Sequence, residues 1–150
     1  SHASEKAFWD VIKLSKAPII CSHSSSMAMC KHDRNLTDEQ LKALAQNGGV
    51  AQVCLLDRYI NEDYKNASLT DAIEHIDHMV KVAGIDHVGI GSDFDGGGGI
   101  IGCESDNDFI QITVKLIEKG YTEEDIAKIW GGNLMRVLDE VQATASVKTL

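Results

Sequence analysis

Residues 88–99, VGIGSDFDGGGG, decide how this sequence is interpreted. A β-type run, Val88–Gly91, is followed by two aspartates two positions apart, Asp93 and Asp95, and then by four glycines. A structural turn needs only one Asp and one Gly, so two carboxylates just after the carboxyl end of a strand indicate a functional site. The glycines 96–99 lack the spacing of a phosphate-binding loop, and they predict either a flexible active-site loop or a tight turn.

Strand and helix patterns alternate along the rest of the chain. Strand-like apolar runs occupy 18–22, 50–56 and 87–93, and helical patterns occupy 4–16, 36–49, 70–84, 106–120, 122–132 and 133–143. The helix at 36–49 carries a capping box, Thr37 with Gln40, and the polar stretch 57–68 is predicted to be a loop. This alternation predicts βαβ units and a parallel sheet.

Composition narrows the class of protein. A chain of 150 residues with 43% hydrophobic content can build one globular domain with a core. The net charge of -9 argues against a nucleic-acid partner, because phosphate binding needs a basic surface. No apolar run is long enough to span a membrane. Four widely spaced cysteines without a CxxC motif favour a reducing, cytoplasmic setting, while export stays open because the chain begins without methionine.

Three potential metal ligands or catalytic groups fall at predicted strand ends. His23 and Asp93 directly follow apolar runs, and His2 stands where a preceding strand would end. Taken singly, each has a simpler explanation as a hydrogen-bonded histidine or a helix cap. Functional groups of parallel α/β folds gather at the carboxyl ends of strands, and imidazole with carboxylate suits a divalent transition metal, most often zinc.

The remaining polar residues are weaker candidates. Arg34 is interpreted either as a surface arginine, paired with Asp33 or Asp38, or as a bidentate clamp for a substrate carboxylate. The other histidines do not match a metalloprotease motif. We expect a solvated helix face for His75 and His78 and structural roles for His32 and His87.

Three stretches together resemble the membrane (renal-type) dipeptidase family: PIICSHSSSMAMCKHDRN (18–35), HIDHMVKVAGIDHVGIGSDFDG (75–96) and GYTEEDIAKIWGGNLMRVL (120–138). The resemblance covers residues 1–142 and implies the amidohydrolase-like (β/α)₈ barrel with a two-zinc centre. Since such a barrel takes about 250 residues, it also implies that this chain is the C-terminal half. That half comprises a stub of the fifth strand and strands six to eight, and residues 143–150 form a loose tail.

The resemblance assigns roles residue by residue. It implies that His2 and His23 are metal ligands and that Asp93 is the catalytic acid/base, which handles the protons of an attacking water and a leaving amine. Arg34 would hold the substrate carboxylate and Tyr59 would line the substrate pocket. Asp95 is given no catalytic role and is expected to shape the loop. The implied reaction is zinc-dependent hydrolysis of dipeptides.

Part of the family site has no counterpart in this sequence. The family also uses an HxD pair after its first strand, a metal-bridging Glu and a further substrate-binding His. We therefore expect the isolated chain to be inactive and to need the N-terminal half of the barrel, from the same parent chain or a separate fragment. A homodimer is also compatible with the resemblance. The alternatives are a non-catalytic half-barrel module and another metallohydrolase, such as a lactonase or deaminase.

Overall fold

Three parallel strands form the sheet in the computed structural model, which describes residues 1–146. They are β1 (Ile20–Cys21), β2 (Val50–Val53) and β3 (Val88–Ile90), in that order across the sheet. The register pairs Ile20 with Val50 and Ala51 with Val88. The alternation of strands and helices therefore confirms the parallel α/β class predicted from the sequence.

Each observed strand lies inside its predicted run but is shorter. All four residues of β2 are buried, as expected for a central parallel strand that is covered on both faces. The stub expected at residues 1–2 forms no strand; His2 lies in coil before the first helix. The chain beyond Val53 leaves the ladder because its backbone bonds cross instead to the loops that follow β1 and β3.

Seven α-helices surround the sheet in the described part of the chain: α1 (Glu5–Leu14), α2 (Asp38–Gln46), α3 (Asp57–Ile60), α4 (Leu69–Ala83), α5 (Phe109–Glu118), α6 (Glu123–Ala127) and α7 (Asn133–Ser146). The predicted capping box of α2 is present, and Gly84 ends α4 with a φ of 93° that favours glycine.

Two segments contain more helix than the sequence predicts. The stretch 57–68 is not only loop, since it holds α3 and the 3₁₀ turn η1 (Tyr64–Asn66), each too short to show a helical period. Helix α7 continues to Ser146, past the end of the apolar pattern, so part of the tail expected at 143–150 is helical. The last four residues of that tail lie outside the described residues.

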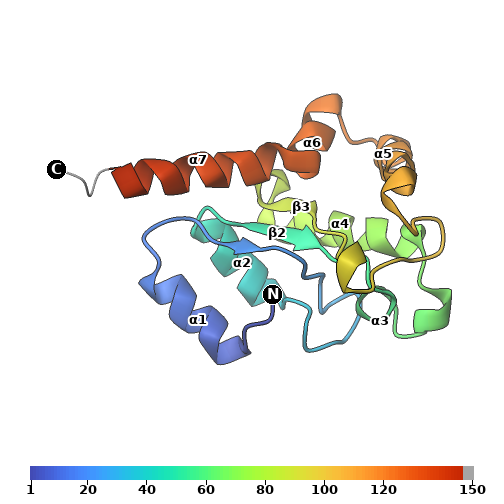
Figure 1. Ribbon diagram of the computed structural model, residues 1–150, viewed down its shortest axis with the longest axis horizontal. Helices are drawn as coiled ribbons and strands as arrows, with labels where there is room; N and C mark the ends of the chain where they lie inside the picture. Colours follow the sequence, from blue (N-terminus) through green and yellow to red (C-terminus); the bar gives the residue numbers. More distant parts are fainter. Residues whose placement is uncertain (147–150) are drawn as a thin grey trace.

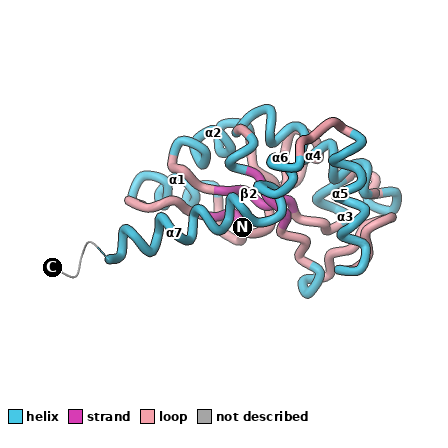
Figure 2. Tube along the Cα trace, turned by 90° about the horizontal axis from the view of Figure 1, so that it is seen from above, coloured by secondary structure: helices cyan, strands magenta, loops and turns pink. Residues whose placement is uncertain are grey.

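Helices lie on both sides of the sheet. Helix α2 packs on β2 from one side and α7 contacts β2 and β3 from the other, and α7 then extends away from the rest of the molecule (Figures 1 and 2). Helix α4 contacts α2 and α5 and contributes Ile73, Ile76 and Met79 to the core. No helix within residues 1–146 is long and apolar enough to cross a membrane.

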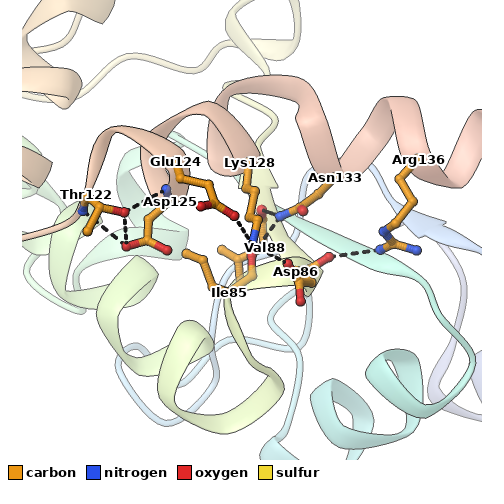
Figure 3. Close-up of polar contacts among 9 residues, drawn as sticks. All are labelled: Ile85, Asp86, Val88, Thr122, Glu124, Asp125, Lys128, Asn133 and Arg136. Atoms are coloured by element: carbon orange, nitrogen blue, oxygen red, sulfur yellow. Dashed lines mark hydrogen bonds and ion pairs between the residues drawn. The ribbon is translucent and has the colours of Figure 1, made fainter.

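The segment IWGGNLMR fixes the amino end of β3 (Figure 3). The buried amide of Asn133 donates to the carbonyl oxygens of Ile85 and Val88 at 2.7 and 2.8 Å, and Arg136 donates to the carbonyl of Asp86 at 2.9 Å. Because these bonds lie at the end of β3 opposite Asp93, this stretch of the family-like motif is structural, and it sets where the strand begins.

Candidate active site

The segments that follow the three strands are tied to one another. The N–H of Ser24, after β1, donates to the carbonyl of Gln52 at 2.8 Å. The Ser25 hydroxyl bonds both backbone groups of Cys54, at 3.1 and 3.2 Å. The N–H of Leu55, after β2, donates to the carbonyl of Ser92 at 2.8 Å. These bonds bring His23 and Asp93 to the same end of the sheet, at the carboxyl ends of its strands, as expected for parallel strands.

His2 and His23 converge at this end. Their Nε2 atoms lie 3.0 Å apart and their ring centroids 5.0 Å apart. The N–H of His23 donates to the Ser1 hydroxyl at 2.9 Å, and its Nδ1 lies 2.9 Å from the Ser22 hydroxyl. Partial burial lowers the pKa of His23, helped by the positive charges of His2 and Arg34 and opposed by Asp93. A neutral imidazole is the form that binds a metal.

Arg34 and Tyr59 form a second cluster beside the histidines. The guanidinium Nε donates to the Ser1 carbonyl at 3.1 Å, and Nη1 donates to the Tyr59 hydroxyl at 3.4 Å. The Arg34 Cζ atom lies 5.3 Å from the centre of the Tyr59 ring, and the His32 ring packs against the same ring at 4.4 Å. The structure therefore places Arg34 against neither Asp33 nor Asp38, the ion-pair partners considered from the sequence.

The third nitrogen of the Arg34 guanidinium, Nη2, is buried without a hydrogen-bond partner in the described residues. A buried N–H of a charged group that lacks an acceptor is costly. Arg34 also lines a cavity of about 410 Å³, together with Phe8, Ser24, Met27 and Asn35. His2, His23 and Asp93 do not line that cavity. The guanidinium is thus held by two of its nitrogens and has a third available for an anionic acceptor.

Asp93 follows β3 in a left-handed conformation, with a φ of 69°, and it is the only non-glycine residue within 1–146 with positive φ. Such a conformation costs about 1–3 kcal/mol and is concentrated at functional sites. The Asp93 carbonyl accepts the N–H groups of Gly96 and Gly98 at 3.0 and 2.8 Å, and the Gly99 N–H donates to Leu55 at 2.8 Å.

These bonds decide between the two interpretations of the glycine run, in favour of a tight turn. A Cβ on Gly96 would lie 2.4 Å from the Asp93 carboxylate oxygen, and one on Gly98 would lie 2.8 Å from the Asp93 carbonyl. A Cβ on Gly98 would therefore collide with backbone, whereas the lack of a Cβ on Gly96 lets the Asp93 carboxylate lie against the turn. Asp95 lies exposed in the turn η3 (Phe94–Gly96).

One histidine was wrongly predicted. His75 is fully buried rather than solvated, because α4 packs that face against the loops that follow β1 and α3. Its Nδ1 accepts the Ser26 N–H and its Nε2 donates to the Ile60 carbonyl, both at 3.0 Å, and burial lowers its pKa to about 4. His78 is partly exposed and contacts the Asp38 carboxylate at 2.7 Å. A hydrophobic pattern cannot distinguish a buried histidine from an exposed one.

Cys54 is the site contact that sequence reasoning missed. Cys54 is fully buried, and its Sγ lies 3.7 Å from Asp93 Oδ2. The available signal was its position, since it directly follows the buried strand β2.

The chain is similar in sequence to known dipeptidases. The sequence model of the membrane dipeptidase family, peptidase family M19, matches residues 1–150. The chain is 42% identical to the dipeptidase ataJ of Aspergillus terreus and 37% identical to the dipeptidase tcpJ of Claviceps purpurea, each over 147 residues and 97% of this chain. It spans about a third of the length of these relatives, 36% and 35%.

Solved structures give the same result. The probable dipeptidase PvdM from Pseudomonas aeruginosa superposes with a TM-score of 0.87 at 31% identity, over 93% of this chain and 49% of that one. A metallopeptidase from Rhodobacter sphaeroides, liganded with a phosphinate mimic of the dipeptide L-Ala-D-Ala, gives the same TM-score at 32% identity, over 93% and 41% of the two chains.

Proposed function

The chain belongs to the membrane dipeptidase family, peptidase family M19, and we propose that it carries the C-terminal part of a zinc-dependent dipeptidase active site. Its relatives are dipeptidases and metallopeptidases, that is, metal-dependent hydrolases. The observation that carries the proposal is the approach of the His2 and His23 Nε2 atoms to 3.0 Å of each other.

This pair of imidazoles fits a shared zinc ion. Two nitrogens bound to one tetrahedral zinc at about 2.05 Å lie about 3.4 Å apart, which is a few tenths of an ångström from the observed separation. Zinc needs further ligands, and no group of three or more His, Cys, Asp or Glu side chains in residues 1–146 could hold a metal ion. The missing ligands would come from the N-terminal half of a (β/α)₈ barrel.

The apolar surface supports such a partner. Val11 and Leu14 of α1, Ile20 of the edge strand β1, and Leu138 of α7 are all exposed, with Leu14 at 79%. In the described residues, β1 pairs only with β2 and leaves its other edge open. An open strand edge and exposed apolar side chains each favour a covering partner. The N-terminal half, on the same parent chain or on a separate fragment, is the cover that we propose.

The chain's own residues then divide the chemistry. Zinc, when bound, activates water as a nucleophile and polarises a carbonyl group. Asp93 accepts the proton of the attacking water and delivers it to the leaving amine. Arg34 binds the substrate carboxylate through its free Nη2, and Tyr59 holds the guanidinium in place. A fixed clamp for the C-terminal carboxylate favours short peptides over long ones.

The test uses the full-length protein, purified with its zinc content measured. We expect about two zinc ions per barrel and hydrolysis of dipeptides, and we expect no hydrolysis by the 150-residue chain alone. His23→Ala should lose bound zinc and activity while keeping its folded circular dichroism spectrum. His78→Ala, which removes a partly exposed histidine that contacts Asp38, should keep both the bound zinc and the activity.

Other outcomes point to the alternatives. A folded full-length protein that binds no zinc and cleaves no dipeptide would support a non-catalytic module. A zinc-loaded protein that hydrolyses lactones or deaminates bases, but leaves dipeptides intact, would support another metallohydrolase. Unchanged zinc content in His23→Ala would remove this histidine from the ligand set.

A further inference from the structure

We propose that Cys54 is a positioning residue that holds the Asp93 carboxylate in its working orientation. This role rests on the proposed dipeptidase function, in which Asp93 transfers protons. It adds to that function a buried thiol, contributed by the residue that directly follows β2.

The contact geometry is the first support. The Sγ atom of Cys54 lies 3.7 Å from Asp93 Oδ2 and 3.9 Å from the Ser92 carbonyl oxygen. Within residues 1–146, this thiol is the hydrogen-bond donor that reaches the Asp93 carboxylate. A Cβ on Gly96 would lie 2.4 Å from an oxygen of the same carboxylate. The carboxylate therefore lies close to both the glycine turn and the thiol.

The protonation state of Cys54 suits a donor. Burial raises the pKa of the Cys54 thiol to about 12, an effect to which the negative charge of Asp93 adds. The group therefore keeps its proton at neutral pH and can donate to a carboxylate. A thiolate at this position would instead repel Asp93.

The backbone of Cys54 is also held, by hydrogen bonds to a neighbouring loop. The Ser25 hydroxyl donates to the Cys54 carbonyl at 3.1 Å and accepts its N–H at 3.2 Å. Ser25 lies two residues after His23. Cys54 thus connects the segment that carries a proposed zinc ligand with the carboxylate that transfers protons, so that the two keep a fixed relative position.

Cys103 provides a matched control. It is equally buried, at 0% exposure, and burial also raises its pKa, to about 11. It lies in the loop after the glycine turn, where its backbone pairs with Ile100. Replacing Cys103 removes a buried thiol of the same kind without touching Asp93, so it measures the cost of a small cavity alone.

The experiment compares Cys54→Ala, Cys54→Ser and Cys103→Ala in the zinc-loaded full-length protein. We expect Cys54→Ala to lower kcat about fivefold with KM and zinc content unchanged, because a donor to the catalytic carboxylate is lost. Cys54→Ser, which keeps a donor, should recover most of kcat. Cys103→Ala should match the wild type in kcat, even if its urea midpoint falls.

A spectroscopic measurement tests the contact without relying on turnover. The S–H stretching band that disappears from the infrared spectrum in Cys54→Ala belongs to Cys54. In Asp93→Asn this band should move to higher frequency, because a neutral amide oxygen is a weaker acceptor than a carboxylate. A band at the same position in the wild type and in Asp93→Asn would overturn the proposal.

The kinetic outcomes distinguish a failure of the proposed Cys54 role from a failure of the proposed dipeptidase function. If the wild-type protein hydrolyses dipeptides and Cys54→Ala has the same kcat as Cys103→Ala, the positioning role is wrong and the proposed function stands. If the wild-type protein hydrolyses no dipeptide, the proposed function fails, and the infrared comparison still decides whether the thiol donates to Asp93.

Discussion

Replacing Arg34 by Gln in the full-length protein tests how the substrate carboxylate is held. The Nη2 atom of Arg34 is buried and unpaired in the described residues, whereas Nε and Nη1 are fixed by Ser1 and Tyr59. A hydrogen bond between charged groups contributes about 1.5–3 kcal/mol. We therefore expect KM for a dipeptide to rise about tenfold to 150-fold, with a smaller effect on kcat.

The assay compares a dipeptide with the same dipeptide carrying a C-terminal amide. The wild-type protein should discriminate against the amide by a similar factor, since the amide offers no negative charge to Nη2. Arg34→Gln should lose this discrimination. Arg34→Lys should lie between the two, because lysine keeps the charge but lacks the planar fork of donors.

Arg58→Gln is the control for this experiment. Arg58 precedes Tyr59 on α3, but its side chain is 66% exposed and its ion-pair contact is Asp57, at 3.7 Å. Its replacement should leave both kinetic constants at wild-type values. If Arg34→Gln still prefers the free carboxylate as strongly as the wild type does, then Arg34 is not the clamp.

Three further perturbations follow from the structure. The pKa of His75 is about 4 in the fold and about 6.5 when unfolded. The unfolded chain therefore binds more protons between these values, and about 3 kcal/mol of stability that is complete above pH 6.5 should be lost as the pH falls toward 4. Urea unfolding across this pH range should show that His75→Gln loses less stability than the wild-type protein does. Asn133→Ala removes two hydrogen bonds at the start of β3 and should lower the free energy of unfolding by about 2–3 kcal/mol. The control Asn66→Ala removes an exposed bond to Asp63 and should lower it by under about 0.5 kcal/mol. Equal urea midpoints for the two variants would contradict this role of Asn133. Gly96→Ala must displace the Asp93 carboxylate, because the new Cβ would lie 2.4 Å from its oxygen, and we expect kcat to fall about tenfold or more at unchanged zinc content; a wild-type kcat would show that the turn can relax.

Local signals in the sequence were sufficient to predict the longer helices. The capping box of Thr37 and Gln40 starts α2, and Gly84 ends α4, where the sequence predicts. Both features depend on residues three or four positions apart, so they can be recognised without the fold. The short elements α3 and η1 gave no such signal, because one turn of helix has no measurable period.

The positions of the candidate site residues could also be predicted from the sequence. His23 and Asp93 were predicted at strand ends, and the structure brings the segments that carry them to one end of the sheet. The sequence could not predict which conformation the glycine loop 96–99 adopts, or why. Only the backbone that returns to the Asp93 carbonyl explains why Gly96 and Gly98 lack side chains.

The sequence by itself determined the parallel α/β class, the main helices and the residues most suited to metal and carboxylate chemistry, because these depend on periodicity, caps and chemical type. The tertiary structure decided which of these residues meet. The 3.0 Å approach of His2 to His23, the burial of His75 and the contact of Cys54 with Asp93 all join residues 21 to 49 positions apart. Such contacts are set by how strands and loops pack in space, and no local pattern in a single sequence encodes them.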